Sequence, residues 1–165
     1  MFIPIYMILR QGIISRNEAG LTFKDFWFFL PLSVAIGFAV GWGEYGVLKA
    51  EPLVPESSVE YALALSVIMI VFVGIVEEFI FRSALQTVLE ERFGSVSGLL
   101  ATSMVFGLMH SGYHLPSEIL FVFFAGIVFG VLFWITKNLL IIAIAHGVTN
   151  ISLFLVAPDY SGLMV

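Results

Sequence analysis

Residues 61–82 read YALALSVIMIVFVGIVEEFIFR, and this stretch contains the two features on which the interpretation of the chain depends. It carries no charge from Tyr61 to Val76, and it becomes apolar again after two adjacent glutamates. A helix needs roughly 20 mainly apolar residues to cross the hydrocarbon core of a bilayer, so this stretch is long enough to span one. Glu77, Glu78 and Arg82 then lie inside a predicted membrane helix.

The composition of the whole chain is that of an integral membrane protein. Of the 165 residues, 60% are hydrophobic and 12% are charged, whereas soluble domains carry about 25% charged residues. The 17 Phe exclude a disordered chain, and the lack of Cys excludes a disulfide scaffold. Seven scattered bases in a chain of net charge −5 give no electrostatic footprint for nucleic acid. We therefore predict a single integral membrane domain over residues 1–165.

Further uncharged runs predict the other membrane helices. They cover residues 26–43, 93–117 with a division at Ser111 and Gly112, 119–136, and 138–158. Together with residues 61–81 they predict an all-α, polytopic transmembrane helix bundle with about five spanning helices. Residues 1–9 are too short for a span and have no basic region, so they predict an interfacial helix or the end of one more span.

The distribution of Lys and Arg predicts the orientation, because cytoplasmic loops keep the positive excess. If the helices alternate, five bases fall on one side of the membrane, namely Arg10, Arg16, Lys24, Arg92 and Lys137. The opposite loop contains Glu51, Glu56 and Glu60, although Lys49 lies beside it. We therefore predict a multi-pass protein of the cell membrane with a cytoplasmic N-terminus.

Two pairs of glycines have the spacing that lets membrane helices approach closely. Gly37 and Gly41 are four residues apart, and so are Gly126 and Gly130. Close helix packing and chance in a chain with 15 Gly are both compatible with either pair.

The glutamates and the arginine of the second span are unexpected, because charged side chains are rare inside membrane helices. An ionised side chain at the centre of a membrane helix costs about 3 kcal/mol on insertion scales. Glu78 and Arg82 are four residues apart, so their charges can cancel on one helix face. Glu77 points about 100° away from Glu78 around the helix and has no local cation. It must find a partner on another helix or become protonated.

Two histidines in other spans are candidate partners. With a rise of about 1.5 Å per residue, Glu77 lies roughly 16 Å from a helix end near Val88. His110 lies roughly 22 Å from a start near Ser95, and His146 roughly 12 Å from Asn138, by the same rise. The three side chains could therefore meet near the middle of the membrane.

Each of these segments also pairs a polar residue with another side chain four positions away. The sequence EEFIFR at 77–82 matches EExxxR, FGLMH at 106–110 matches FxxxH, and HGVTN at 146–150 matches HxxxN. In this order, the three motifs resemble those of the CAAX protease and bacteriocin-processing (Abi) family of intramembrane endopeptidases. The resemblance covers about 75 residues, within a motif-bearing core at about 61–157.

The resemblance implies a role for each matched position. Glu77 and His110 would activate a water molecule for attack on a peptide carbonyl. Glu78 and Arg82 would form the ion pair that orients the catalytic helix. His146 and Asn150 would supply an oxyanion hole. Phe106 would pack behind His110.

Less specific interpretations exist for the same residues. A structural ion pair explains Glu78 and Arg82 but leaves Glu77 unexplained. Taken alone, His110 fits an interfacial residue at a helix end, and Asn150 fits an interhelical hydrogen bond. Zinc bound by Glu77, His110 and His146 is an alternative, although the HExxH helix typical of zinc proteases is absent. The resemblance favours a water activated by glutamate, so we predict a metal-free site with no cofactor.

The sequence thus predicts an intramembrane endopeptidase that hydrolyses peptide bonds of hydrophobic or lipid-tethered substrates. Its expected partners are membrane-embedded or membrane-associated peptides and the lipid bilayer, with no nucleic acid. One alternative is a small transporter or proton relay, because intramembrane carboxylates and histidines also serve that purpose. Another is a non-proteolytic immunity or scaffold protein that retains the motifs.

Overall fold

The computed structural model describes residues 2–53 and 58–158, and every regular element within these ranges is a helix. Four helical segments are long and apolar enough to cross a membrane. They are α2 (Phe26–Leu48), the continuous segment Val59–Phe93, α7 (Pro116–Thr136) and the segment Leu139–Val156. The predicted all-α polytopic bundle is confirmed.

Two of these segments combine α-helix with π-helix. The segment Val59–Phe93 consists of α3 (Val59–Ile68), η1 (Met69–Gly74), α4 (Ile75–Glu78), η2 (Phe79–Gln86) and α5 (Thr87–Phe93), of which η1 and η2 are π-helical. The segment Leu139–Val156 consists of α8 (Leu139–Ile151) and the π-helical η4 (Ser152–Val156). Stretches of π-helix occur frequently at functional sites.

The span expected within residues 93–117 is present as a shorter helix. α6 (Ser95–Met109) has 15 residues, which corresponds to a length of roughly 22 Å. It follows α5 after Gly94, whose φ of 87° is readily available only to glycine. After His110, the 3₁₀ turn η3 (Ser111–Tyr113) leads to α7. α6 is thus shorter than the helix of roughly 20 residues that is needed to cross a bilayer completely.

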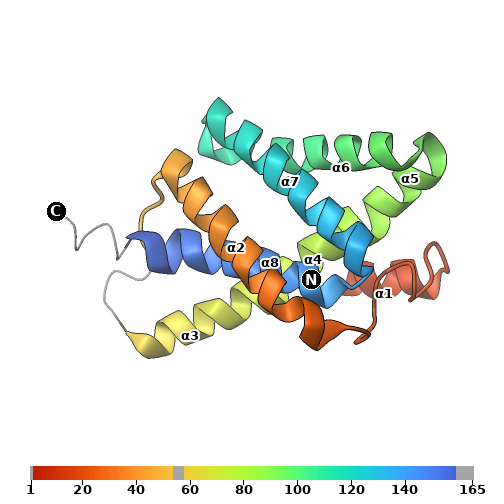
Figure 1. The fold of residues 1–165 in the computed structure, drawn as a ribbon, viewed down its shortest axis with the longest axis horizontal. Coiled ribbons are helices and arrows are strands. Elements are labelled where there is room, and N and C mark those ends of the chain that lie inside the picture. Colours follow the sequence, from red (N-terminus) through yellow and green to blue (C-terminus); the bar gives the residue numbers. More distant parts are fainter. Residues whose placement is uncertain (1, 54–57, 159–165) are drawn as a thin grey trace.

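Helix α8 lies between the other elements of the bundle. Figure 1 shows α2 crossing over α8, and α6 and α7 forming a separate pair beside them. α8 contacts α2, η1, α4 and α7, while α6 contacts α5, η2 and α7. The residues of α8 therefore face several other helices at once.

Glycines of α2 allow it to lie very close to α8. A Cβ added to Gly37 would lie 2.5 Å from the carbonyl oxygen of Ala145, and one added to Gly41 would lie 2.5 Å from that of Thr149. The second pair acts similarly between α7 and α6, where a Cβ at Gly126 would lie 3.2 Å from Cα of Ser103. Both glycine pairs are therefore sites of close helix packing.

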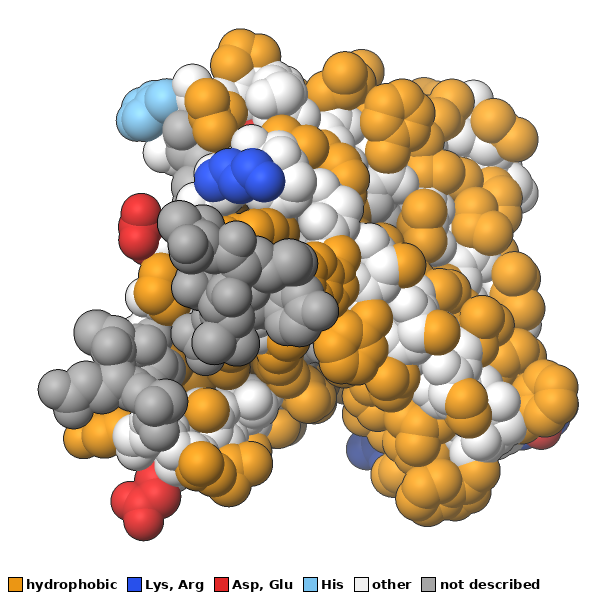
Figure 2. Space-filling model, turned by 60° about the vertical axis from the view of Figure 1, so that its left-hand side comes forward, with side chains coloured by type: hydrophobic (Ala, Val, Ile, Leu, Met, Phe, Trp, Pro, Cys, Tyr) orange, Lys and Arg blue, Asp and Glu red, His pale blue; other side chains and the backbone are white. Residues whose placement is uncertain are grey.

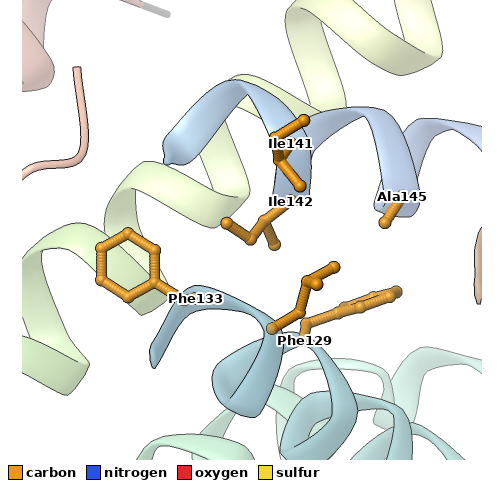
Figure 3. Packing of buried hydrophobic residues seen from close by; sticks show 6 residues of the cluster. Phe129, Phe133, Ile141, Ile142 and Ala145 are labelled. Carbon is orange, nitrogen blue, oxygen red and sulfur yellow. The ribbon is translucent and has the colours of Figure 1, made fainter. Parts of the chain in front are cut away.

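Large apolar side chains fill the space between α7 and α8. Phe129 and Phe133 of α7 pack against Ile141, Ile142 and Ala145 of α8 (Figure 3). Because lipid tails are as apolar as these side chains, the attraction here comes from close van der Waals contact rather than from escape from water. This cluster holds α8 against the pair formed by α6 and α7.

The N-terminal helix α1 (Ile3–Arg10) packs along the bundle. The ring of Phe2 lies 5.8 Å from that of Phe72. Ile5, Ile8 and Leu9 pack against a buried cluster that includes Phe79. α1 therefore lies beside the segment Val59–Phe93.

Four basic residues lie toward one end of the bundle. The ends of α5 and α7 and the segment before α2 share one end, on the right in Figure 1. This end contains Arg16, Lys24, Arg92 and Lys137. Hydrophobic side chains cover most of the face shown in Figure 2, as expected for a surface in contact with lipid. The assignment of the basic end to the cytoplasm remains a prediction.

Candidate functional site

The site begins where the segment Val59–Phe93 crosses α8, because glycines allow the two backbones to meet there. A Cβ on Gly74 would lie 2.5 Å from the carbonyl oxygen of Ala143, and a Cβ on Gly147 would lie 2.7 Å from Cα of Ile70. Glu77 and Glu78 follow Gly74 by one turn, and His146 precedes Gly147. The crossing therefore brings the carboxylates of α4 next to the imidazole of α8.

Glu78 connects two helices through its two carboxylate oxygens. Oε2 lies 3.0 Å from Nε of Arg82, and Oε1 lies 2.7 Å from Nδ1 of His146. The side chains of Glu78 and Arg82 are fully buried. The predicted pairing of Glu78 with Arg82 is present, and the contact with His146 adds a partner that the sequence did not reveal.

The contact with Glu78 also determines the orientation of the His146 ring. An ionised carboxylate can only accept a hydrogen bond, so Nδ1 of His146 carries the proton in this contact. The other nitrogen, Nε2, lies 3.9 Å from Oε2 of Glu77. The ring also stacks on Phe129, with centroids 5.6 Å apart. Glu77 thus faces a partner from another helix, as its lack of a local cation required.

His110 follows directly after the end of α6, and its ring is held by the preceding turn. Its Nδ1 lies 2.9 Å from the carbonyl oxygen of Phe106, which can only accept a hydrogen bond. Nδ1 therefore donates, and Nε2 is left as the basic nitrogen of a neutral ring. The rings of Phe106 and His110 are 4.9 Å apart, so Phe106 packs against His110 as expected.

Phe106 also covers the buried arginine. The guanidinium carbon of Arg82 lies 4.7 Å from the centre of the Phe106 ring, a distance typical of a cation–π contact. Nη1 and Nη2 of Arg82 have no hydrogen-bond partner among the described residues. Glu78, Phe106 and the ring of Phe81, whose centre lies 6.0 Å from the same carbon, are thus contacts that compensate this buried charge.

Four motif residues, Glu77, His110, His146 and Asn150, share one cavity of about 360 Å³. This volume is within the range of pockets that hold small ligands. Its lining combines polar and apolar side chains, which are Glu44, Leu53, Met69, Val73, Glu77, His110, His146, Asn150 and Phe154. Glu78, Arg82 and Phe106 do not line this cavity. Glu78 contacts His146 and Arg82, and Phe106 contacts His110.

A second, much smaller pocket adjoins the polar wall of the cavity. Its volume is about 10 Å³, which is about the space that one water molecule needs. Its polar lining includes Glu44, His110, His146, Thr149 and Asn150. The site thus offers a position for a single water molecule between the histidines.

Glu44 and Glu118 are site residues that the sequence did not reveal. Both are buried, in α2 and α7 respectively. In the sequence they mark the ends of uncharged runs, which suggested positions at the membrane surface. The apolar residues Tyr45–Leu48 continue the run beyond Glu44. This continuation was the one signal that Glu44 lies within the helix.

No metal site is assembled in the part of the chain that the structure describes. Within residues 2–53 and 58–158, no group of three or more His, Asp or Glu side chains is arranged to hold a metal ion. Catalysis without a metal or cofactor stays a prediction.

Comparison with known proteins gave one match. A family model described as type II CAAX prenyl endopeptidase Rce1-like matches residues 59–152. This range contains all three motifs, from Glu77 to Asn150. No curated protein and no solved structure matches the chain significantly.

Proposed function

Because the chain belongs to the Rce1-like family of type II CAAX prenyl endopeptidases, we propose that it cleaves peptide bonds within or at the edge of the bilayer. The observation that supports this most directly is the common cavity of Glu77, His110, His146 and Asn150. These residues come from three separate helical segments, and together they provide a base and hydrogen-bond donors. Both are required for attack of water on an amide.

In this mechanism, Glu77 and His110 activate the water. Nδ1 of His110 donates to Phe106, so Nε2 is the nitrogen that accepts the proton of the water. The water oxygen then bonds to the peptide carbonyl carbon. When the C–N bond breaks, the proton passes from Nε2 of His110 to the leaving amine, and the neutral ring of His110 is regenerated.

His146 and Asn150 stabilise the oxyanion that forms during the attack. Asn150 donates through its amide, and His146 donates through Nε2 in its doubly protonated form. The carboxylate of Glu78, which contacts Nδ1 of His146, then balances the positive charge of this ring. Glu77, Glu78, Arg82 and His146 together carry two negative and two positive charges, which limits the cost of burying them.

The substrate is a hydrophobic or lipid-tethered peptide. The apolar part of the cavity wall includes Leu53, Met69, Val73 and Phe154. A lipid-tethered peptide would be concentrated at the membrane surface before it enters the cavity. We propose prenylated CAAX-type peptides as the first substrates to test, in accordance with the family.

The test uses the purified protein in lipid vesicles with a fluorogenic prenylated peptide. We expect Glu77→Gln to lower kcat by about 10²- to 10⁴-fold, because Gln keeps the size of the side chain but removes the carboxylate that activates the water together with His110. Glu91→Gln is a matched control, since Glu91 is exposed in α5 of the same helical segment. Undiminished proteolysis by a folded Glu77→Gln protein would show that Glu77 does not activate the water.

A further inference from the structure

Two buried carboxyl groups outside the three motifs meet beside the site. Glu44 of α2 is 7% exposed, and Glu118 of α7 is fully buried. Their side chains are within hydrogen-bonding distance of each other. The helices meet at this level, because a Cβ on Gly43 would lie 3.0 Å from the ring of Phe121. Two carboxylates are costly inside a membrane protein, so the pair needs an explanation.

A hydrogen bond between two carboxyl groups requires a proton on one of them. No hydrogen-bond donor among the described residues reaches either carboxyl oxygen of Glu118. Two ionised carboxylates at this distance would repel each other strongly in a medium of low dielectric constant. At least one of the two carboxyl groups is therefore protonated in this contact.

The pair adjoins the reactive part of the cavity. Glu44 lines both the cavity and the water-sized pocket, in each case together with His110, His146 and Asn150. Glu118 is close enough to His110 for their charges to interact. Four ionisable side chains thus surround His110, namely Glu44 from α2, Glu77 from α4, Glu118 from α7 and His146 from α8.

We propose that Glu44 and Glu118 share one proton and that their single negative charge stabilises His110 when it takes a proton from the attacking water. This inference rests on the proposed function, because it assigns the pair to the hydrolytic step. The proton of the water moves to Nε2 of His110 and then to the leaving amine. The shared proton stays between the two carboxyl groups. Glu44 and Glu118 are therefore positioning residues.

Kinetics of single and double variants test the role of the charge. In Glu44→Gln or Glu118→Gln the amide of the new Gln can donate a hydrogen bond to the remaining carboxylate and so preserve the charge, and we expect kcat within about threefold of the wild type. The double variant has no charge there, and we expect its kcat to fall about 10- to 100-fold with little change in KM. If the pair were only a structural contact, each single variant would lose stability, and kcat would not fall specifically in the double variant. A double variant with wild-type kcat would overturn the proposed role.

Infrared spectroscopy tests the shared proton without measuring activity. In an ester-free detergent at neutral pH, the wild type should show a carbonyl band of a protonated carboxyl group that shifts in D₂O. Each single variant should lose this band, because its remaining carboxyl group ionises. Glu91→Gln should keep the band. A band that persists in both single variants would overturn the sharing of a proton.

The two experiments separate this inference from the proposed function. If the wild type cleaves peptides and the double variant does so equally well, the charge on the pair has no role in hydrolysis, while the proposed function stands. If the wild type cleaves no peptide but the single variants lose the band, the shared proton is supported and the proposed function is wrong.

Discussion

Glu78 is the residue on which the geometry of the site depends most. One of its oxygens contacts Arg82 in its own helical segment, and the other contacts His146 in α8. A buried ion pair gives little net stability, because desolvation offsets the attraction. The removal of one partner is costly, however, since it leaves an uncompensated charge. This difference leads to a prediction about Arg82.

Replacement of Arg82 by Gln should lower the free energy of unfolding by about 3–5 kcal/mol, because Glu78 would remain as an unpaired buried charge. The double variant Glu78→Gln/Arg82→Gln should recover much of this loss. Thermal unfolding in detergent measures both effects. Arg92→Gln serves as the control, because Arg92 is exposed in α5. Equal stability of Arg82→Gln and Arg92→Gln would contradict the prediction.

Asn150 allows a test of the proposed oxyanion hole. Asn150→Ala should lower kcat about 10²- to 10³-fold with KM nearly unchanged, because a donor to the oxyanion acts mainly in the transition state. Steady-state kinetics with the peptide substrate measure this. Asn17→Ala changes an exposed Asn in the segment before α2 and should have no effect. A rise in KM with constant kcat would instead assign Asn150 to substrate binding.

The sequence predicted the site residues unevenly. Spacing and helix geometry correctly suggested that Glu77, His110 and His146 could share one cavity. The contact between Glu78 and His146 could not be predicted, because it depends on the rotation of α8 about its axis. Glu44 and Glu118 were missed because a charge at the end of an apolar run usually lies at the membrane surface.

At the scale of elements, the helical segment that carries Glu77 and Glu78 alternates between α-helix and π-helix. π-helical stretches lie on both sides of α4 (Ile75–Glu78). Each such stretch changes the direction in which the following side chains point, since its hydrogen bonds connect residues five apart. Apolar periodicity alone cannot predict this, because π-helix depends on packing against neighbouring helices. The approximate positions of the spans were nevertheless correct.

Contact between α2 and α8 leads to a prediction with a control in the same helix. Gly37→Ala should lower the free energy of unfolding by about 1–3 kcal/mol, because its Cβ would overlap with the backbone of Ala145. Gly46→Ala should not destabilise the protein, since nothing lies within 4 Å of the added Cβ. Thermal unfolding midpoints compare the two variants. A loss of stability in Gly46→Ala as large as that in Gly37→Ala would show that helix contact is not the cause.

At the scale of the whole molecule, composition and run lengths established the class of fold. Four segments meet the length of a span, and α6 is a shorter apolar helix. The sequence did not reveal that α8 would contact so many other elements, because burial around a helix is set by tertiary packing. It also did not predict that α1 would lie along the segment Val59–Phe93.

The predicted orientation can be tested with introduced cysteines, because the chain has no Cys of its own. A cysteine replacing Glu60 should react with a membrane-impermeant thiol reagent in intact cells, whereas one replacing Lys137 should react only after permeabilisation. The two positions lie at opposite ends of the bundle. Labelling in the reverse pattern would place the N-terminus outside the cell.

The site residues are far apart in the sequence, and this spacing determines when during synthesis the protein can become active. Glu44 and Glu77 leave the ribosome long before His146 and Asn150, which belong to α8. A nascent chain that has inserted only α2 to α7 has neither the proposed oxyanion donors nor the imidazole partner of Glu78. Activity would therefore arise only after α8 has entered the membrane. Neighbouring proteins at the insertion machinery would be protected from premature cleavage until then.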